Sequence, residues 1–101
     1  MAKRVDISEK LQFDEDPVLV INGEEIEVNS GAETALRLMG IMSGPRTMVN
    51  VVGALEIMFG EENTQKICSM TDASGKKLKV ESLMTIMEQG ISLIMGTSEG
   101  E

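Results

Sequence analysis

The chain has 101 residues, of which 42% are hydrophobic and 26% charged, a composition typical of one globular domain rather than of a disordered chain. Nine basic and seventeen acidic side chains give a net charge of −8, which disfavours binding to nucleic-acid phosphates and to anionic membranes. Histidine, the commonest general base and zinc ligand, is missing, as are Trp and Tyr. The composition favours binding over catalysis.

Residues 1–16 are polar and charged and end in the acidic run Asp14-Glu15-Asp16 before Pro17. We expect them to form a flexible or loosely docked N-terminal arm, with Leu11 and Phe13 as candidate anchors. The positive charge near the N-terminus is not followed by an apolar run, so no signal peptide is expected. No apolar stretch approaches the roughly 18 residues of a membrane-spanning helix, and the simplest expectation is a cytoplasmic protein.

A β-hairpin is predicted over residues 18–28. Two β-prone runs flank Asn22-Gly23, a dipeptide that tolerates the positive φ angles of a tight hairpin turn. In the second run Ile26 and Val28 alternate with glutamates, which predicts one buried and one solvated face. Because a lone hairpin is only marginally stable in water, we expect it to pack on the helices that follow.

Four apolar stripes at helical spacing predict helices over residues 31–43, 48–59, 61–70 and 80–95. In the first helix the apolar face is predicted to comprise Ala32, Ala35, Leu36, Met39 and Met42. The predicted fold class is therefore α+β, mostly α, with a short N-terminal β-hairpin followed by three to four amphipathic helices in a compact bundle. Residues 17–96 are expected to form this single globular domain, and residues 97–101 a polar tail.

The ends of these helices carry recognisable signals. Ser30 with Glu33 fits a capping box at the start of the first helix, and Thr47 is a candidate N-cap for the second. Gly44-Pro45 is expected to stop the first helix, and Gly60 to end or kink the second. Gly96 is a candidate left-handed stop for the last helix.

Motifs for chemistry are weak. The acidic run at 14–16 lacks the glycine and distal glutamate of an EF-hand loop, and Gly40 to Gly44 lacks the Lys-Ser/Thr ending of a phosphate loop. Cys68 is the only cysteine and is expected to be a small buried residue. Lys76, Lys77 and Lys79 are typical of a solvated loop. Catalytic, cofactor-binding and metal-binding residues are therefore not predicted.

The nine methionines, apart from Met1, all lie between Met39 and Met95. Methionine adapts to irregular shapes, so these residues either fill the core or form a soft polypeptide-binding surface. We expect such a surface on the second and last long helices, where the apolar stripes are dense. The predicted protein-binding residues are Met58, Phe59, Leu83, Met84 and Met87.

The hairpin Val18-Leu-Val-Ile-Asn-Gly-Glu-Glu-Ile-Glu-Val28 leads into a helix that starts near Ser30. A later helix ends in Ile57-Met-Phe-Gly-Glu-Glu62 and precedes Gln65-Lys-Ile-Cys68 and a last apolar helix. This order of elements, over about residues 11 to 95, resembles the tail assembly chaperones of long-tailed phages and prophages of Gram-positive bacteria.

The resemblance implies a small, non-catalytic, phage-encoded protein that acts in the bacterial host cytoplasm and is not expected in the mature virion. Its implied partners are the tape measure protein, which such chaperones keep soluble, and the tail tube protein that polymerises around it. Many members self-associate, and many are also made in a longer form by a ribosomal frameshift. The resemblance transfers no catalytic residue and no cofactor.

Two other classes of function remain open at this point. The acidic chain is also compatible with an inhibitor or nucleic-acid mimic that blocks a basic partner through charge. A small structural phage subunit is the third interpretation. Salt distinguishes the chaperone from the charge mimic, because charge-driven binding weakens with ionic strength whereas binding through apolar contacts changes little.

Overall fold

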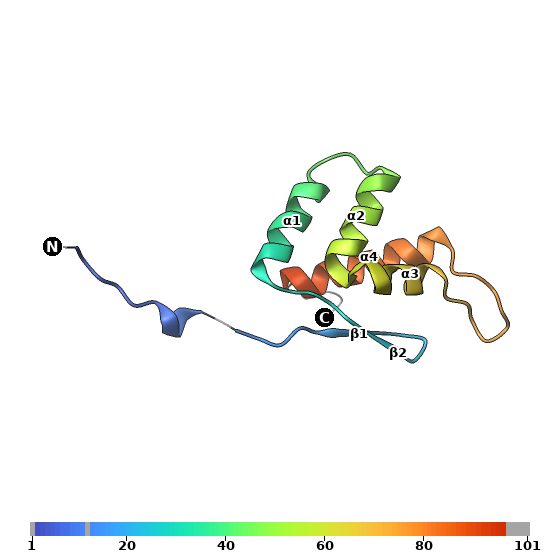
Figure 1. Cartoon of the computed structure of the whole chain (residues 1–101), viewed down its shortest axis with the longest axis horizontal. Helices are drawn as coiled ribbons and strands as arrows, with labels where there is room; N and C mark the ends of the chain where they lie inside the picture. The colour runs from blue at the N-terminus through green and yellow to red at the C-terminus, as the bar shows by residue number, and fades with distance from the viewer. Residues whose placement is uncertain (1, 12, 97–101) are drawn as a thin grey trace.

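The computed structural model describes residues 2–11 and 13–96, and this part of the chain contains a β-hairpin followed by four α-helices (Figure 1). The predicted α+β, mostly α fold is confirmed. The third helix ends at Cys68 rather than at residue 70. The bounds are β1 Val18–Ile21, β2 Glu24–Glu27, α1 Ala32–Met42, α2 Met48–Phe59, α3 Glu61–Cys68 and α4 Val80–Met95.

The hairpin has the predicted turn and the predicted two faces. Asn22 and Gly23 both have positive φ, 51° and 83°, as a two-residue turn with the twist of its flanking strands requires. The strands pair antiparallel with Leu19 opposite Ile26. Ile26 and, just after β2, Val28 are buried, whereas Glu25 and Glu27, which alternate with them, are exposed.

The start of α1 differs from the predicted capping box. The N-cap is Gly31, which has no side chain to accept a hydrogen bond. The Ser30 hydroxyl instead donates to Asp16 Oδ1 at 2.9 Å, and the Ser30 N–H donates to the same oxygen. Glu33 pairs with Arg37 one turn along the helix. Asp16 thus competes successfully for Ser30 and fixes the root of the N-terminal arm beside α1.

Three other predicted helix-end signals are present in the structure. Thr47 Oγ1 accepts a hydrogen bond from Asn50 N at 3.2 Å and caps α2. Gly60, with φ 87°, ends α2 and lets α3 begin at the next residue. Gly96 lies in the left-handed region at the end of α4. Residues 97–101, the predicted polar tail, lie outside the described residues.

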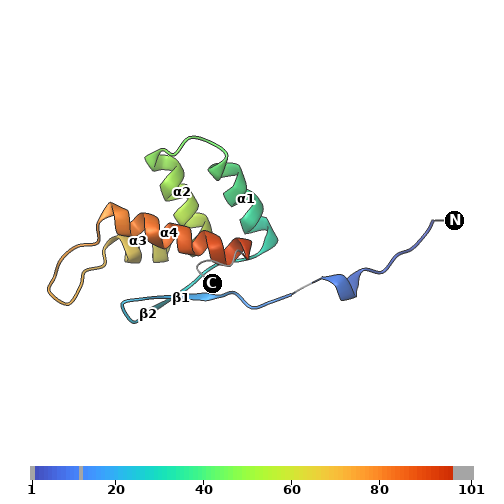
Figure 2. The same ribbon diagram turned by 180° about the vertical axis from the view of Figure 1, so that it is seen from behind.

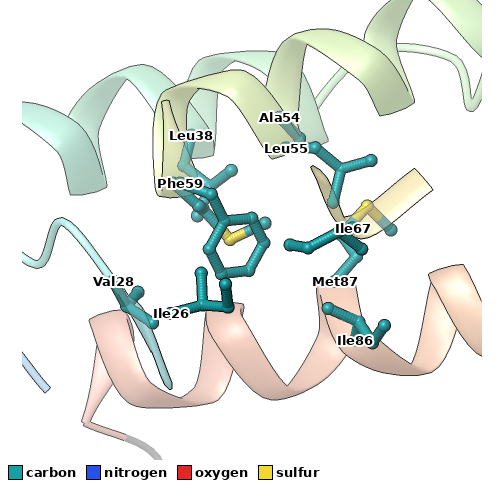
Figure 3. Packing of buried hydrophobic residues seen from close by; sticks show 10 residues of the cluster. Ile26, Val28, Leu38, Ala54, Leu55, Phe59, Ile67, Ile86 and Met87 are labelled. Atoms are coloured by element: carbon teal, nitrogen blue, oxygen red, sulfur yellow. The ribbon is translucent and has the colours of Figure 1, made fainter. Parts of the chain in front are cut away.

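The hydrophobic core collects residues from β2, from the segment after it and from all four helices (Figure 3). The ring of Phe59 points toward Ile26, so the hairpin covers the C-terminal half of α2. A backbone hydrogen bond of 2.8 Å from Asn29 N to Met58 O fixes the chain after β2 to the same place. The buried hydrophobic residues are Ile26, Val28, Leu38, Ala54, Leu55, Met58, Phe59, Ile67, Ile86 and Met87.

The helices form a small body from which the N-terminal arm projects (Figure 2). In both views α4 runs crosswise to the pair α1 and α2, and the arm points away from the helices. The arm gives the molecule a long dimension of 68 Å against 30 and 28 Å. It contains one short 3₁₀ turn, η1, Ser8–Lys10. Leu11 and Phe13 are exposed, so the prediction that they could anchor the arm is wrong.

Two helical glycines differ sharply in their surroundings. A Cβ added at Gly90 in α4 would lie 3.0 Å from Met58 Sδ and 3.1 Å from Phe59 Cζ, closer than ordinary packing allows. A Cβ added at Gly40 in α1 would have nothing within 4 Å. The absent side chain at Gly90 therefore lets α4 approach α2 in the core.

We expect Gly90→Ala to lower the free energy of unfolding by about 1–2 kcal/mol, because overpacking of the Met58 and Phe59 side chains outweighs the gain in helix propensity. The matched control Gly40→Ala should raise the free energy of unfolding by up to about 1 kcal/mol. Urea unfolding of the two variants tests this. Equal stabilisation by both substitutions would contradict the close approach of α4 to α2.

Candidate polypeptide-binding surface

Three of the five side chains predicted to bind a partner belong to the core. Met58, Phe59 and Met87 are 0%, 5% and 4% exposed, so the prediction that they are available to a partner is wrong. The physical reason is that the hairpin and α4 cover this side of α2. Burial of these side chains stabilises the fold and leaves them no area to offer to another chain.

The other two predicted residues, Leu83 and Met84, lie on α4 and are half-buried. Both pack against the core cluster that contains Met58, Phe59 and Met87, so the structure brings all five predicted residues together. They meet as parts of one interior rather than as one external patch. For Leu83 and Met84 a role in binding stays a prediction.

The structure exposes a different apolar strip, on α1. Ala32, Leu36 and Met39 on α1, and the small polar C-cap Ser43 just after it, follow one another at the i, i+4, i+7, i+11 spacing of a coiled-coil seam, and all four are exposed. Leu36 is 69% exposed, although it is a large apolar side chain. These four residues, the α1 strip, lie opposite the buried Thr34 and Leu38, which face the core.

A second exposed apolar set lies at the start of α2. Met48 and Val49 are each 79% exposed, and Val52 one turn later is also exposed. These three residues form the α2 patch. The only charged residue between positions 38 and 55 is Arg46, just before α2, so this region is cationic in a protein with a net charge of −8.

The sequence predicted the inward face of α1 wrongly. The stripe of Ala32, Leu36 and Met39 reads as a core face, but α1 buries Thr34 and Leu38 instead. A buried threonine among apolar residues on the other side weakened the correct pattern. The α2 sequence is apolar on nearly every side, so periodicity could not assign its outward face. The sequence signal that could have indicated the exposed apolar region is the presence of a single charged residue between positions 38 and 55, because protein surfaces are usually rich in charged side chains.

Two ion pairs are present among the described residues. Arg37 bonds Glu33 at 3.0 Å at the border of the α1 strip, and Lys66 bonds Glu24 at 2.9 Å between α3 and the hairpin turn. A depression beside Arg46 has a volume of about 70 Å³, well below the roughly 300–1,000 Å³ of pockets for small molecules. This depression is therefore too small to hold a typical small-molecule ligand.

The lysine-bearing segment after α3 is the predicted exposed loop. Asp72 Oδ1 accepts hydrogen bonds from the N–H groups of Ser74 and Lys76, both at 2.9 Å, and from the Ser74 hydroxyl. The bonds from Lys76 and Ser74 lower the pKa of the Asp72 carboxyl. Asp72 thus organises the loop that presents the lysines, all of which are exposed.

Cys68 is exposed at the end of α3, so the prediction of a buried residue is wrong. The reason is that α3 turns Thr64 and Ile67 toward the core, and the next residue points away. Among the described residues no group of three or more His, Cys, Asp and Glu side chains could hold a metal ion. Over the same residues, none of the helices has the length and apolar character needed to cross a membrane.

Comparison of the chain with protein-family models, with curated proteins and with solved structures finds no match.

Limited peroxide oxidation should separate the methionines by location. Because Met48 and Met39 are exposed, we expect them to form sulfoxide first, whereas Met58 and Met87 are shielded in the core. Peptide mass spectrometry after short exposure measures the order. Oxidation of Met58 as fast as Met48 in the folded protein would contradict the assignment of the core.

The carboxyl of Asp72 should titrate below its ordinary value of 3.8. A pKa that is lower in the folded state stabilises the fold above the unfolded pKa, and this contribution disappears as pH falls through the folded pKa. Ser74→Ala removes one donor and should move the titration midpoint back toward 3.8. Carboxyl NMR titration of both proteins measures the shift, and identical midpoints would show that Ser74 does not stabilise the carboxylate.

Proposed function

We propose that this protein is a non-catalytic tail assembly chaperone of a long-tailed phage or prophage, and that it binds the tape measure protein through the α1 strip. The observation that carries the proposal is the row of exposed apolar and small side chains on α1, with Leu36 and Met39 at its centre. A row with this spacing fits one face of a second amphipathic helix.

The expected client is a long helical chain with apolar faces that remain uncovered until the tail assembles. Burial of Leu36 and Met39 against such a face is worth roughly 1.5–3 kcal/mol for each side chain, which supports weak, reversible contacts. Many weak contacts along one long client suit a chaperone, because each copy must leave when the tube closes around the client. Methionine tolerates the varied apolar shapes of such a client.

The charge distribution supports the same role. A net charge of −8 gives mutual repulsion between copies, which opposes non-specific aggregation of a protein with exposed apolar residues. Met39 on α1 and the exposed apolar side chains at the start of α2 lie in a region where Arg46 is the single charge between positions 38 and 55. Leu36 lies just outside this region, beside the exposed Glu33–Arg37 ion pair.

In this proposal the protein acts in the host cytoplasm, uses no cofactor and does not remain in the mature virion. Its partners are the tape measure protein and the tail tube protein, and copies of the chaperone self-associate.

Co-expression with the tape measure protein of the same phage tests the proposal. We expect the chaperone to raise the soluble fraction of this client several-fold, and Met39→Glu to abolish most of the gain by placing a charge in the α1 strip. Val80→Glu is the matched control, because Val80 is exposed at the start of α4, away from α1. Circular dichroism confirms that both variants fold. No gain in solubility with the unmodified chaperone would contradict the proposal.

The binding itself should be insensitive to salt. Raising the ionic strength from about 0.05 to 0.5 M should change the affinity for the client little, because the contact is apolar. A loss of most of the affinity over this range would instead indicate a charge mimic. Detection of the chain at stoichiometric amounts in purified virions would indicate a structural subunit.

A further inference from the structure

The N-terminal arm carries large apolar side chains that its own domain leaves uncovered. Val5, Ile7, Leu11 and Phe13 are all exposed, and Phe13 is 87% exposed. Phe13 is one of two phenylalanines in the chain, and the other, Phe59, is in the core. Asp14 and Glu15 follow Phe13 directly, so the end of the arm nearest the domain presents an aromatic ring next to two acidic groups.

The α2 patch has the complementary character. Met48, Val49 and Val52 offer apolar area, and Arg46 supplies a positive charge immediately before them. An arm segment with an apolar ring followed by carboxylates matches a patch with apolar side chains preceded by a guanidinium. The pairing combines burial of apolar area with opposite charges at the rim.

The arm leaves the α2 patch of its own chain uncovered, since it points away from the helices (Figures 1 and 2) and Phe13 is 87% exposed. Asp16 is tied to Ser30, and the segment after β2 is bonded to Met58 near the far end of α2. The root of the arm is therefore fixed near the end of α2 that lies away from Met48 and Val49, and the rest of the arm is directed away from its own domain.

We propose that two copies of this chain exchange their N-terminal arms, with Phe13 of each copy seated on the α2 patch of the second copy. The carboxylates of Asp14 and Glu15 then lie toward Arg46 of that copy. The exchange is reciprocal, so the same pair of surfaces is buried twice around a two-fold axis.

The estimated buried area favours two reciprocal arm contacts over a single docked arm. Phe13 and Leu11 against the α2 patch bury about 600 Å² in total, taking about 150–250 Å² for a fully buried aromatic side chain and less for the aliphatic ones. Two reciprocal contacts bury about 1,200 Å², the lower limit of specific protein interfaces. One contact alone is about half that area. The dimer is therefore weak, and its formation does not use the α1 strip.

Disulfide trapping tests the exchange in the full-length chain. In a Cys68→Ser background, Phe13→Cys with Val49→Cys should give a reducible covalent dimer on mild oxidation, because the proposed exchange brings these two positions together between copies. Phe13→Cys with Val80→Cys is the matched control, since Val80 is also well exposed, at the start of α4, and should stay monomeric. Recovery of the first pair as monomer only, or equal dimer from both pairs, would overturn the proposal. A ladder of larger species would overturn its reciprocal closure.

Sedimentation equilibrium without any client provides the second measurement. Phe13→Ser should raise the dimer dissociation constant at least about tenfold, because an exposed aromatic anchor is lost. Val20→Ser, at an exposed position on the outer face of the hairpin, should leave the constant unchanged. A monomeric unmodified chain at about 100 μM would overturn the exchange. Met39→Glu should dimerise normally, so loss of client binding and loss of arm exchange are separable.

Discussion

Burial of the inner face of the hairpin against α2 determines which surfaces the rest of the molecule can offer. Ile26 and Val28 enter the same core as Phe59, and the bond from Asn29 to the Met58 carbonyl holds this register. A two-stranded hairpin is not stable alone in water, so it takes the C-terminal half of α2 as its partner. The consequence is that the richest apolar stripe in the sequence becomes interior.

The same contact explains why exposure is concentrated elsewhere. With the C-terminal half of α2 occupied, α4 completes the core by crossing at Gly90, where the missing side chain allows close approach to Met58. Helix α1 then packs only its Thr34 and Leu38 side, which leaves Leu36 and Met39 without an internal partner. The apolar area on α1 and at the start of α2 is therefore what remains after the core is full.

Local signals in the sequence predicted the elements well because each has a local physical cause. Asn22-Gly23 specifies the hairpin turn, Thr47 caps α2, and Gly60 and Gly96 end their helices through backbone conformation alone. The prediction of a capping box failed because Ser30 bonds Asp16, which lies fourteen residues earlier in the chain. A local sequence pattern cannot predict such a distant hydrogen-bond partner.

The prediction of the binding surface failed for a related reason, because the tertiary fold decides which side of a helix faces outward. α2 is apolar all round, so only the placement of the hairpin decides that Met58 is buried and Met48 exposed. The sequence contains no histidine, and this excludes a histidine base or metal ligand from these residues independently of the fold. Periodicity could rank helices by apolar content, but apolar content is highest where the core is, not where a partner binds.

The two proposals are compatible because they use separate surfaces, the α1 strip for a client and the α2 patch for the arm of a second copy. The α1 strip and the α2 patch belong to neighbouring helices joined by one short loop that contains Arg46. A client helix seated on Leu36 and Met39 need not displace an arm seated on Met48 and Val49, so paired copies can each hold one stretch of a long client. Two linked weak sites bind such a chain far more tightly than either site alone, because the second contact forms at a high effective concentration. Under the two proposals, the arm, which projects from the globular domain, sets how strongly paired copies hold a client.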